Sequence, residues 1–278
     1  KLLRKKVVIS VTAFAGKRWF NMSNSRLKAH ILYLLETACL KLPYDRIVPL
    51  GSNFLEEIKE LDVDPKSIVY LTPTTVDLQS FNPNIDGLQV RKKYGIAEDE
   101  LVVLFVSTID RTKGVFHLLD AFKEFHDIHP KSKLVFVGPG RDIDNLKKAI
   151  VQLNLDNSVV ITGRIDHSEM PEVMACADVY VRPGFTEGMP MAVIEALACG
   201  KAVIAADVGG TSEIIIHGKT GLLINPKDLN ATVRFLVDLS KDEGFRYNLG
   251  KNGRALIESK YTLEKMTQDY LTLYNGLA

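Results

Sequence analysis

The sequence predicts an α/β protein with a doubly wound parallel sheet, preceded by a partial domain of the same kind. Short and almost entirely apolar runs recur along the chain, as expected for strands that are buried on both faces. Longer segments lie between them, and their apolar residues repeat at helical spacing. Glycines follow one apolar run after another, at the points where strands would turn into helices. Together these three patterns favour strands and helices that alternate along the chain.

The composition is that of an ordinary globular protein. The chain has 278 residues, of which 46% are hydrophobic and 25% charged, and this length allows two domains or one large one. The formal net charge of +1 gives no argument for a nucleic-acid partner, and no apolar run approaches the roughly 20 residues of a membrane span. All three cysteines, Cys39, Cys176 and Cys199, fall in apolar helical stretches, so we expect buried thiols in a reduced, intracellular protein.

The first 71 residues contain only part of a sheet. The expected strands are 7–11, 46–50 and 67–71, and the expected helices are 52–61 and one that begins near Ser25 and stops before Pro43. Residues 72–84 are rich in Pro, Thr and Asn without an apolar period, which predicts a linker. The basic lead-in at 1–6 is typical of a solvated end, with contact to a membrane surface as the alternative.

A complete alternation of strands and helices begins near Gln89. The expected strands are 101–106, 133–137, 158–161, 179–181, 202–205 and 221–224, and the expected helices follow Gly114 and Ser168 and cover 143–153, 189–199 and 263–277. Near-continuous apolar strands between helices indicate a parallel sheet that is covered by helices on both faces.

The helix around Glu195 contains a single charge among apolar residues. The neighbours of Glu195 from 192 to 198 are all apolar, so its carboxylate would be buried, and a buried carboxylate without partners is too costly to keep. Glu187 stands eight positions earlier, in the loop that leads into this helix. Two interpretations remain open: Glu195 pairs with a core Arg or Lys or caps a neighbouring backbone, or it binds a ligand.

Glycine loops follow five of the expected strands. In an open parallel sheet, ligands bind beyond the carboxyl ends of the strands. Arg111, Lys113 and Gly114 come after strand 101–106, where two cations and the free N–H groups of a helix N-terminus suit a diphosphate. The other loops are Gly138–Arg141, Gly163–Arg164, Gly184–Gly188 and Asp207–Thr211. Each alone is a common turn, but together with the two carboxylates they predict a site for a nucleotide sugar.

Two further motifs are weaker candidates. The run Gly218-Lys219-Thr220 suggests a phosphate-binding P-loop, but position 213 is Glu where that motif requires glycine. His126 and His129, with carboxylates nearby in the sequence, would suggest a metal ligand set. Their place at the end of an expected helix instead favours solvated caps, so we predict no metal site.

From about Gln89 to the end, the chain carries the motifs of one known family in order. They are Lys113-Gly114, Val137-Gly138-Pro139-Gly140, Gly163, Glu187 and Glu195 with seven residues between them, Glu195–Gly200, Gly209-Gly210 with Glu213, and Gly218–Leu223. With them the chain resembles the C-terminal, donor-binding half of retaining glycosyltransferases of the GT-B fold, group 1 type. The resemblance implies a Rossmann-like donor domain and a UDP- or GDP-linked sugar as donor substrate, with no cofactor and no metal.

The resemblance also implies a division into domains. Residues 1–88 resemble the latter part of the acceptor-side domain and the linker, so we expect a truncated, partial Rossmann-like domain there. Residues 89–262 would form the complete nucleotide-sugar-binding domain, and the helix within 263–278 would pack back toward the first domain. A cytoplasmic location is expected, with peripheral contact to the inner face of the membrane through the first domain.

The resemblance assigns roles by position. Lys113, helped by Arg111, would hold the diphosphate and stabilise it as the leaving group. Glu187 would act at the donor sugar together with the turn Gly188-Met189-Pro190, and Glu195 would bind the ribose hydroxyls. The remaining donor-binding residues are Gly138 and the backbone that would hold the base, namely Gly163, Arg164 and Ile165.

Three features of the sequence depart from the family pattern. Ser107 and Thr108 stand where the family has Gly-Arg, so Arg111 is the nearest arginine, and Thr74-Thr75 replaces a common Asn-Gly. Related enzymes often carry a histidine in the loop that corresponds to 12–16, and none occurs here. The leading hypothesis is a retaining hexosyltransferase that acts on a glycan or lipid-linked acceptor. The alternative is a nucleotide-sugar-binding half or subunit without transferase activity alone, and a sugar-nucleotide epimerase is a weaker third hypothesis.

Overall fold

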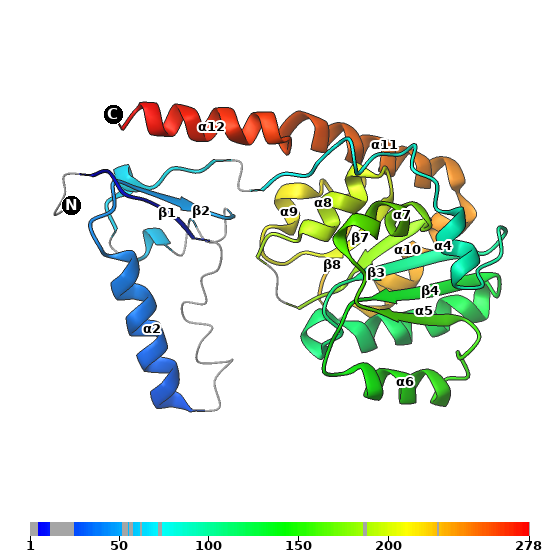
Figure 1. Ribbon diagram of the computed structural model, residues 1–278. Coiled ribbons are helices and arrows are strands. Elements are labelled where there is room, and N and C mark those ends of the chain that lie inside the picture. Colours follow the sequence, from blue (N-terminus) through cyan, green and yellow to red (C-terminus); the bar gives the residue numbers. More distant parts are fainter. Residues whose placement is uncertain are drawn as a thin grey trace. The chain divides into compact units, whose positions relative to one another are not determined.

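The computed structural model describes residues 5–11, 25–51, 55, 58–61, 63–71, 74–185, 188–226 and 228–277. The chain divides into two compact units (Figure 1): the first comprises Lys1–Thr75 and Leu263–Ala278, and the second comprises Val76–Thr262. Each unit contains a parallel sheet and helices, so the predicted α/β class is confirmed.

Residues 76–88 belong to the second unit, whereas the sequence suggested a boundary after residue 88. The guanidinium of Arg254 donates to the carbonyl oxygens of Phe81 and Ala198 over 2.6 and 2.7 Å. The Phe81 side chain is buried as well. These contacts hold the segment before helix α4 (Leu88–Lys93) against the second unit.

The second unit is built on a six-stranded parallel sheet with the order β5-β4-β3-β6-β7-β8. The chain moves outward from β3 to β5 and then returns to the other side of β3 with β6, which makes the sheet doubly wound. The strands are β3 (Leu101–Val106), β4 (Ser132–Val137), β5 (Val159–Gly163), β6 (Val179–Arg182), β7 (Ala202–Ala206) and β8 (Leu222–Ile224). Each strand begins and ends within two residues of its predicted bounds.

Helices cover both faces of this sheet (Figure 1). One face carries α5 (Val115–Ile128), α6 (Ile143–Gln152) and α10 (Leu229–Lys241), and the other carries α8 (Met191–Ala198) and α11 (Glu243–Lys260). The short elements between them are η3 (Arg111–Lys113), η4 (His167–Glu169), α7 (Met170–Ala175) and α9 (Thr211–Ile214). Helix α8 begins two residues later than predicted, because Pro190 occupies its N-cap position.

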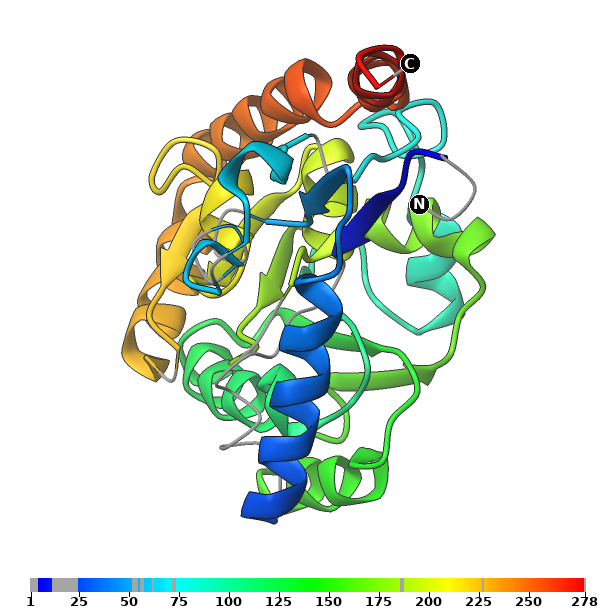
Figure 2. The same ribbon diagram turned by 90° about the vertical axis from the view of Figure 1, so that its left-hand side faces the viewer.

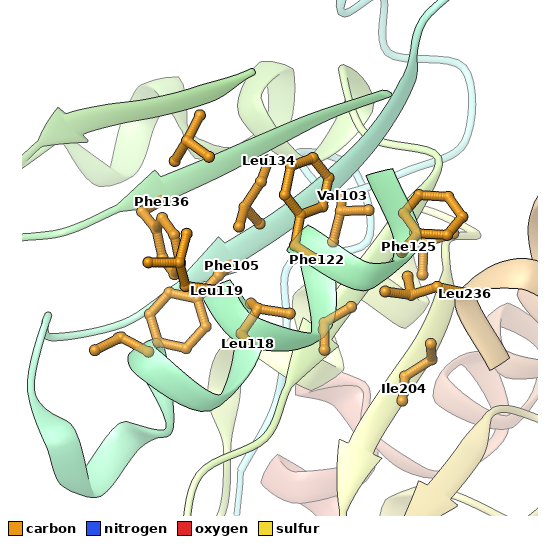
Figure 3. Close-up of a cluster of buried hydrophobic side chains, with 14 of the residues drawn as sticks. Val103, Phe105, Leu118, Leu119, Phe122, Phe125, Leu134, Phe136, Ile204 and Leu236 are labelled. Carbon is orange, nitrogen blue, oxygen red and sulfur yellow. The ribbon is translucent and has the colours of Figure 1, made fainter. Parts of the chain in front are cut away.

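The main core layer lies between the sheet and α5 (Figure 3). Val102 and Leu104 of β3 point away from this layer, since side chains alternate along a strand, yet they are fully buried too. The continuous apolar run of β3 is therefore explained by burial on both faces of the sheet. Fully buried side chains of the layer include Val103, Phe105, Leu118, Leu119, Phe122, Phe125 and Phe136.

No element was expected between 225 and 262, where α10 and α11 lie. α11 contains Gly250 and Gly253, which weaken the helical pattern in the sequence. A Cβ at Gly250 would lie 1.9 Å from the carbonyl oxygen of Gly200, and one at Gly253 would lie 2.5 Å from Leu197. The glycines thus allow α11 to pack closely on α8.

In the first unit, β1 (Val8–Val11) pairs in parallel with β2 (Arg46–Pro49), and α2 (Arg26–Leu40) lies between them in sequence. In Figure 2, α2 is the long blue helix that leads away from these strands. Helix α12 (Leu263–Asn275) belongs to the same unit, and its Tyr270 hydroxyl lies 3.3 Å from that of Ser10.

The third strand predicted for this unit, at 67–71, is wrong. Ile68 makes only a single bridge to Ile47, because Pro65–Ser67 forms the 3₁₀ helix η2, which ends directly before it. Half of the helix predicted for 52–61 lies outside the described residues; of the described half, 55, 58 and 59 are helical and 60 and 61 form a turn.

Two of the three thiols are buried as predicted. Burial raises the pKa of Cys176 to about 11 and that of Cys199 to about 12. The prediction is wrong for Cys39, which is exposed because it lies about 100° around the helix axis from its buried neighbour Leu40. Within the described ranges, none of the helices is both long and apolar enough to cross a membrane.

Gly138 lets the loops at the carboxyl edge of the sheet approach each other closely. It follows β4 with a φ of 136°, and a Cβ there would lie 1.9 Å from the carbonyl oxygen of Ser107, in the loop after β3. The Gly138 amide also donates to the carbonyl oxygen of Gly163, at the end of β5, over 2.8 Å. Gly163 has a φ of 73°, but nothing lies within 4 Å of its Cβ position. Gly138 therefore fixes the spacing of three loops.

His126 is a partly buried bridge rather than the predicted solvated cap. Its Nδ1 lies 2.9 Å from Oγ of Ser132, and its Nε2 lies 3.0 Å from Oγ of Ser158. Its ring stacks on Phe122 with the ring centres 5.5 Å apart. Because burial disfavours the charged imidazolium, the pKa of His126 is lowered. The side chain ties α5 to the starts of β4 and β5.

The lowered pKa of His126 predicts that acid destabilises the fold through this residue. Protonation is less favourable in the folded protein than in the unfolded chain, where a histidine titrates near 6.5. The contribution of His126 to stability is therefore complete above about pH 6.5 and is lost as the pH falls through the folded-state pKa. Urea denaturation at a series of pH values from neutral to mildly acidic should show a shallower loss of stability for His126→Gln than for the parent protein.

Ser158→Ala is the matched control, because it removes one hydrogen bond but keeps the imidazole. It should lower the free energy of unfolding by about 1 kcal/mol and keep the pH dependence of the parent. Equal pH dependence for the parent and His126→Gln would contradict the bridging role.

Gly138→Ala should destabilise the protein more than Gly163→Ala. A positive φ costs a residue with a side chain about 1–3 kcal/mol at either position, but only at Gly138 does the new methyl group meet a backbone atom. Urea denaturation should therefore show a clearly larger loss in the free energy of unfolding for Gly138→Ala. Equal losses would mean that the loops after β3 and β4 do not depend on this contact.

Candidate functional site

The candidate site lies where the winding of the sheet reverses, at the carboxyl ends of β3 and β6. Ligands of doubly wound sheets bind beyond this point. Two of the predicted loops meet here, since the amide of Phe185 donates to the carbonyl oxygen of Thr112 over 2.9 Å. A Cβ at Gly114 would lie 2.5 Å from the carbonyl oxygen of Pro183. The loop that carries the cations is therefore in direct contact with the loop that leads to α8.

Arg111 and Lys113 lie in η3, directly before the first turn of α5. The Asp110 carboxylate caps η3 by accepting from the amide of Thr112 over 2.8 Å, and hydrogen bonds from Thr112 lower the pKa of Asp110. Gly114 then turns the chain into α5 with a φ of 75°. The structure thus places both predicted cations at a helix N-terminus, where the free N–H groups also favour anions.

The guanidinium of Arg111 contacts two neighbouring side chains, yet most of the side chain is exposed to solvent. Its guanidinium lies 4.7 Å from the centre of the Phe116 ring and 3.6 Å from the Asp142 carboxylate, and the side chain is 68% exposed. The neighbouring Arg141 pairs with Asp110 over 2.6 Å. Arg111 therefore has room to engage a ligand at this edge.

Glu195 is buried in α8, with 7% of its surface exposed. Its Oε1 lies 2.9 Å from Nε2 of His167, whose side chain is 75% exposed and packs against Phe81 at 5.5 Å between ring centres. The partner in the described structure is thus a surface imidazole, whereas one interpretation of the sequence expected a core Arg or Lys or a backbone cap. A single partner at the rim leaves the second carboxylate oxygen available for a ligand.

The turn Gly188-Met189-Pro190 connects the loops after β6 and β7. The carbonyl oxygen of Gly188 accepts from the amide of Gly210 over 2.8 Å, and a Cβ at Gly210 would lie 3.0 Å from Met189. Met189 is buried, and Pro190 leads into α8. The predicted residue Glu187, together with Thr186, lies outside the described residues.

Gly163, Arg164 and Ile165 lie at the end of β5, next to Gly138. Arg164 is exposed and Ile165 is half-buried. Their loop continues into η4, which brings His167 to Glu195. The two parts of the predicted donor site are therefore joined through a histidine that lies 28 positions before Glu195 in the sequence.

Arg182 was not predicted, although it lies at the centre of the site. It ends β6 with 7% exposure, its Nη1 donates to the carbonyl oxygen of Val106 over 3.0 Å, and its guanidinium lies 5.6 Å from the Phe105 ring centre. The signal in the sequence was a cation directly after a buried apolar strand. Arg182 bridges the carboxyl ends of the two strands between which the winding reverses.

Half-buried His117 and buried Thr211 are further polar residues at this edge. His117 lies in the first turn of α5, its ring is 6.4 Å from that of Phe185, and burial lowers its pKa. The Nε2 of His117 and the hydroxyl of Thr211 are buried without a hydrogen-bond partner among the described residues. As for metals, the part of the chain that the structure describes contains no group of three His, Cys, Asp or Glu side chains placed to hold an ion.

Comparison with known proteins gives, over most of the second unit, the family that the sequence motifs resemble. Residues 88–256 match the family model described as Glycosyl transferases group 1. N-acetyl-alpha-D-glucosaminyl L-malate synthase of Bacillus anthracis is 27% identical over 83% of this chain and 59% of its own length. The GDP-mannose-dependent alpha-(1-6)-phosphatidylinositol monomannoside mannosyltransferase of Mycolicibacterium smegmatis is 31% identical over 68% of this chain and 52% of its own. The chain thus spans a little over half the length of these relatives.

Solved structures match the fold over nearly the whole chain. Sucrose-phosphate synthase from Thermosynechococcus elongatus has a TM-score of 0.83 at 25% identity and covers 97% of this chain and 67% of its own. Anabaena HepE in complex with UDP has a TM-score of 0.86 at 18% identity, with 99% and 73% covered, which shows a shared fold alone. The fold is that of GT-B glycosyltransferases, and because the family model covers more than half of the sequence, this chain belongs to the group 1 glycosyl transferases.

Proposed function

We propose that this chain carries the donor site of a retaining glycosyltransferase, which transfers a sugar from a nucleoside-diphosphate sugar to a glycan or lipid-linked acceptor. The observation that carries the proposal is Glu195, a carboxylate with 7% exposure at the carboxyl edge of a doubly wound sheet. Removing a carboxylate from water is costly unless it accepts hydrogen bonds. The vicinal hydroxyls of a ribose are donors that suit it, and among the described residues the contact from His167 is to one of its two oxygens, Oε1.

Lys113 and Arg111 are proposed to bind the diphosphate at the start of α5. As the bond between sugar and phosphate breaks, negative charge grows on the departing diphosphate, and the two cations and the helix N–H groups stabilise it. Glu187 and the turn 188–190 would face the donor sugar, while the backbone of 163–165 would hold the base beside Gly138. In this mechanism the chain accelerates the reaction by orienting the donor and by stabilising its leaving group.

The names of the relatives support the class of donor and acceptor. The Mycolicibacterium relative is described as GDP-mannose-dependent and as acting on a phosphatidylinositol monomannoside, and Anabaena HepE was solved with UDP. We therefore propose a UDP- or GDP-linked donor and an acceptor at the inner face of a membrane. The three unbridged cysteines support a cytoplasmic location.

A second candidate is a nucleotide-sugar-binding half or subunit without transferase activity alone. It is favoured by the first unit, whose described residues supply a sheet of two strands, compared with six in the second unit. Incubation of the purified chain with donor sugars separates the two candidates. The transferase hydrolyses or transfers the sugar, whereas the binding module holds the donor without turnover.

Glu195→Ala and Lys113→Ala should affect different parts of the donor. Glu195→Ala should weaken the binding of the nucleoside and of its diphosphate alike, by about tenfold to hundredfold, since a hydrogen bond to a charged group contributes about 1.5–3 kcal/mol. Lys113→Ala should weaken the binding of the diphosphate much more than that of the nucleoside, because the proposed contact of Lys113 is to the phosphates. Isothermal titration with UDP and GDP and their nucleosides measures both effects.

Glu169→Ala is the control for these two variants, because Glu169 is half-exposed in the nearby element η4 and pairs with Lys93 at 3.8 Å. It should leave nucleotide affinity unchanged. If Glu195→Ala remains folded by circular dichroism and binds as the parent does, Glu195 is a core residue and the proposed donor site is wrong.

His167→Ala tests whether this imidazole positions Glu195. Without the contact to Oε1, the Glu195 carboxylate should lose its fixed orientation. The affinity for UDP or GDP should then fall by about tenfold, and the preference for the nucleotide over its 2′-deoxy form should be reduced. His167→Gln can still donate a hydrogen bond and should retain more of the affinity and more of the preference for the ribonucleotide than His167→Ala. An equal loss for ribo- and deoxynucleotides would place the effect of His167 elsewhere on the ligand.

A further inference from the structure

The most deeply buried charges of the described chain gather at one edge of the sheet. Among the described residues, the three charged residues with the smallest exposed fractions are Asp142, Arg182 and Glu195, each exposed by 7%. All three lie at the carboxyl edge, and charged side chains are almost never fully buried unless they are paired. Glu195 is proposed to bind ribose, and Asp142 lies 3.6 Å from the guanidinium of Arg111. Arg182 has as yet no role in the proposed function.

Arg182 stands where the winding of the sheet reverses. β3 and β6 pair in parallel with Leu104 opposite Tyr180, so the same register places Arg182 opposite Val106. Its Nη1 donates to the carbonyl oxygen of Val106 over 3.0 Å. This contact holds the guanidinium at the ends of the two strands beyond which ligands of doubly wound sheets bind.

The chain directly after Arg182 contacts the turn that carries the other cations. A Cβ at Gly114 would lie 2.5 Å from the carbonyl oxygen of Pro183, and the amide of Phe185 donates to the carbonyl oxygen of Thr112 over 2.9 Å. The segment that begins with Arg182 therefore packs against η3 and the first turn of α5, where the diphosphate is proposed to bind.

The contact with the Val106 carbonyl does not require a cation. The hydroxyl of Tyr180 donates to the same oxygen over 3.3 Å, so a neutral side chain already serves it. A guanidinium is not deprotonated in a protein, so Arg182 is buried with its charge, and the burial of a charge is costly. A charge that is kept at this cost, at the ligand edge of the sheet, indicates that the charge itself is used.

Carboxylates offset part of the positive charge of the loops after β3 and β4. Asp142 lies 3.6 Å from Arg111, and Asp110 lies 2.6 Å from Arg141. Each phosphate of a nucleoside-diphosphate sugar carries a negative charge, and a site with little water makes every contact between charges stronger. A further cation at the end of β6 would therefore add to the binding of a diphosphate.

We propose that Arg182 is a further donor-binding residue, whose guanidinium binds phosphate oxygens of the donor's diphosphate. A guanidinium has five N–H donors in a planar fork, so it can hold the Val106 carbonyl and phosphate oxygens at the same time. Because the sheet fixes its position, the cation is preorganised for the charge that grows on the departing diphosphate. This inference rests on the proposed function and deepens it, because it adds a cation from β6 to the two of η3.

The test is isothermal titration of the full chain with uridine and UDP, and with guanosine and GDP. Arg182→Met removes the charge and keeps most of the length of the side chain. It should weaken the binding of UDP or GDP by about tenfold to hundredfold and leave the affinity for the nucleoside unchanged. Arg182→Lys keeps the charge without the planar fork, so it should regain part of the lost diphosphate affinity.

Tyr180→Phe is the matched control, because it removes the other hydrogen bond to the Val106 carbonyl and leaves the charge in place. It should bind UDP and GDP as the parent does, and circular dichroism checks that every variant is folded. If Arg182→Met does not fold, Arg182→Lys still carries the test, because it should bind the diphosphate more weakly than the parent and the nucleoside equally well.

An equal loss for nucleoside and diphosphate in the Arg182 variants, or the same loss in Tyr180→Phe, would show a structural role and overturn the inference. Unchanged diphosphate affinity in Arg182→Met would overturn it as well, while the proposed donor site would stand. A parent chain that binds neither UDP nor GDP would overturn the donor site and this inference together, so the two failures are distinguishable.

Discussion

The candidate site depends on how closely the loops approach one another at the carboxyl edge of the sheet. Gly138 brings the loop after β4 against the loop after β3, and Gly114 brings the start of α5 against the loop after β6. A side chain at either glycine would overlap a carbonyl oxygen, so the loops could not keep their positions. The placement of Arg111 and Lys113 beside the loop that leads to α8 follows from these two contacts.

The burial of the Glu195 carboxylate is not explained by a contribution to the stability of the fold. Its apolar neighbours remove the carboxylate from water, and its described partner is one imidazole at the surface. Replacing such a pair by packed apolar side chains is often neutral or stabilising, so a fold gains little from it. Because Glu195 is costly for the fold and lies at the carboxyl edge of a doubly wound sheet, where ligands bind, we propose that it is kept for a ligand. In this proposal the contact from His167 orients the carboxylate.

The sequence predicted best those strands and site residues whose signal lies in the neighbouring residues of the chain. A run such as Leu101–Val106 is apolar throughout because helices cover both of its faces, and the cations of η3 and the apolar neighbours of Glu195 are equally local features. Contacts between distant residues could not be predicted. His167 lies 28 positions before Glu195, and Arg182 donates to a carbonyl 76 positions earlier. For the same reason the sequence suggested a solvated His126, whose second serine partner is 32 positions away.

The measurement that tests the central claim most directly is hydrogen–deuterium exchange of the whole chain with and without saturating UDP or GDP. If the donor binds at the carboxyl edge, amides in 107–114, 138–142, 163–167 and 188–195 should exchange more slowly with nucleotide. Amides at the opposite edge of the same sheet, in 98–101 and 175–178, should be unaffected. Protection confined to the opposite edge or to the first unit, or no protection by either nucleotide, would contradict the assignment of the site to Glu195 and the loops around it.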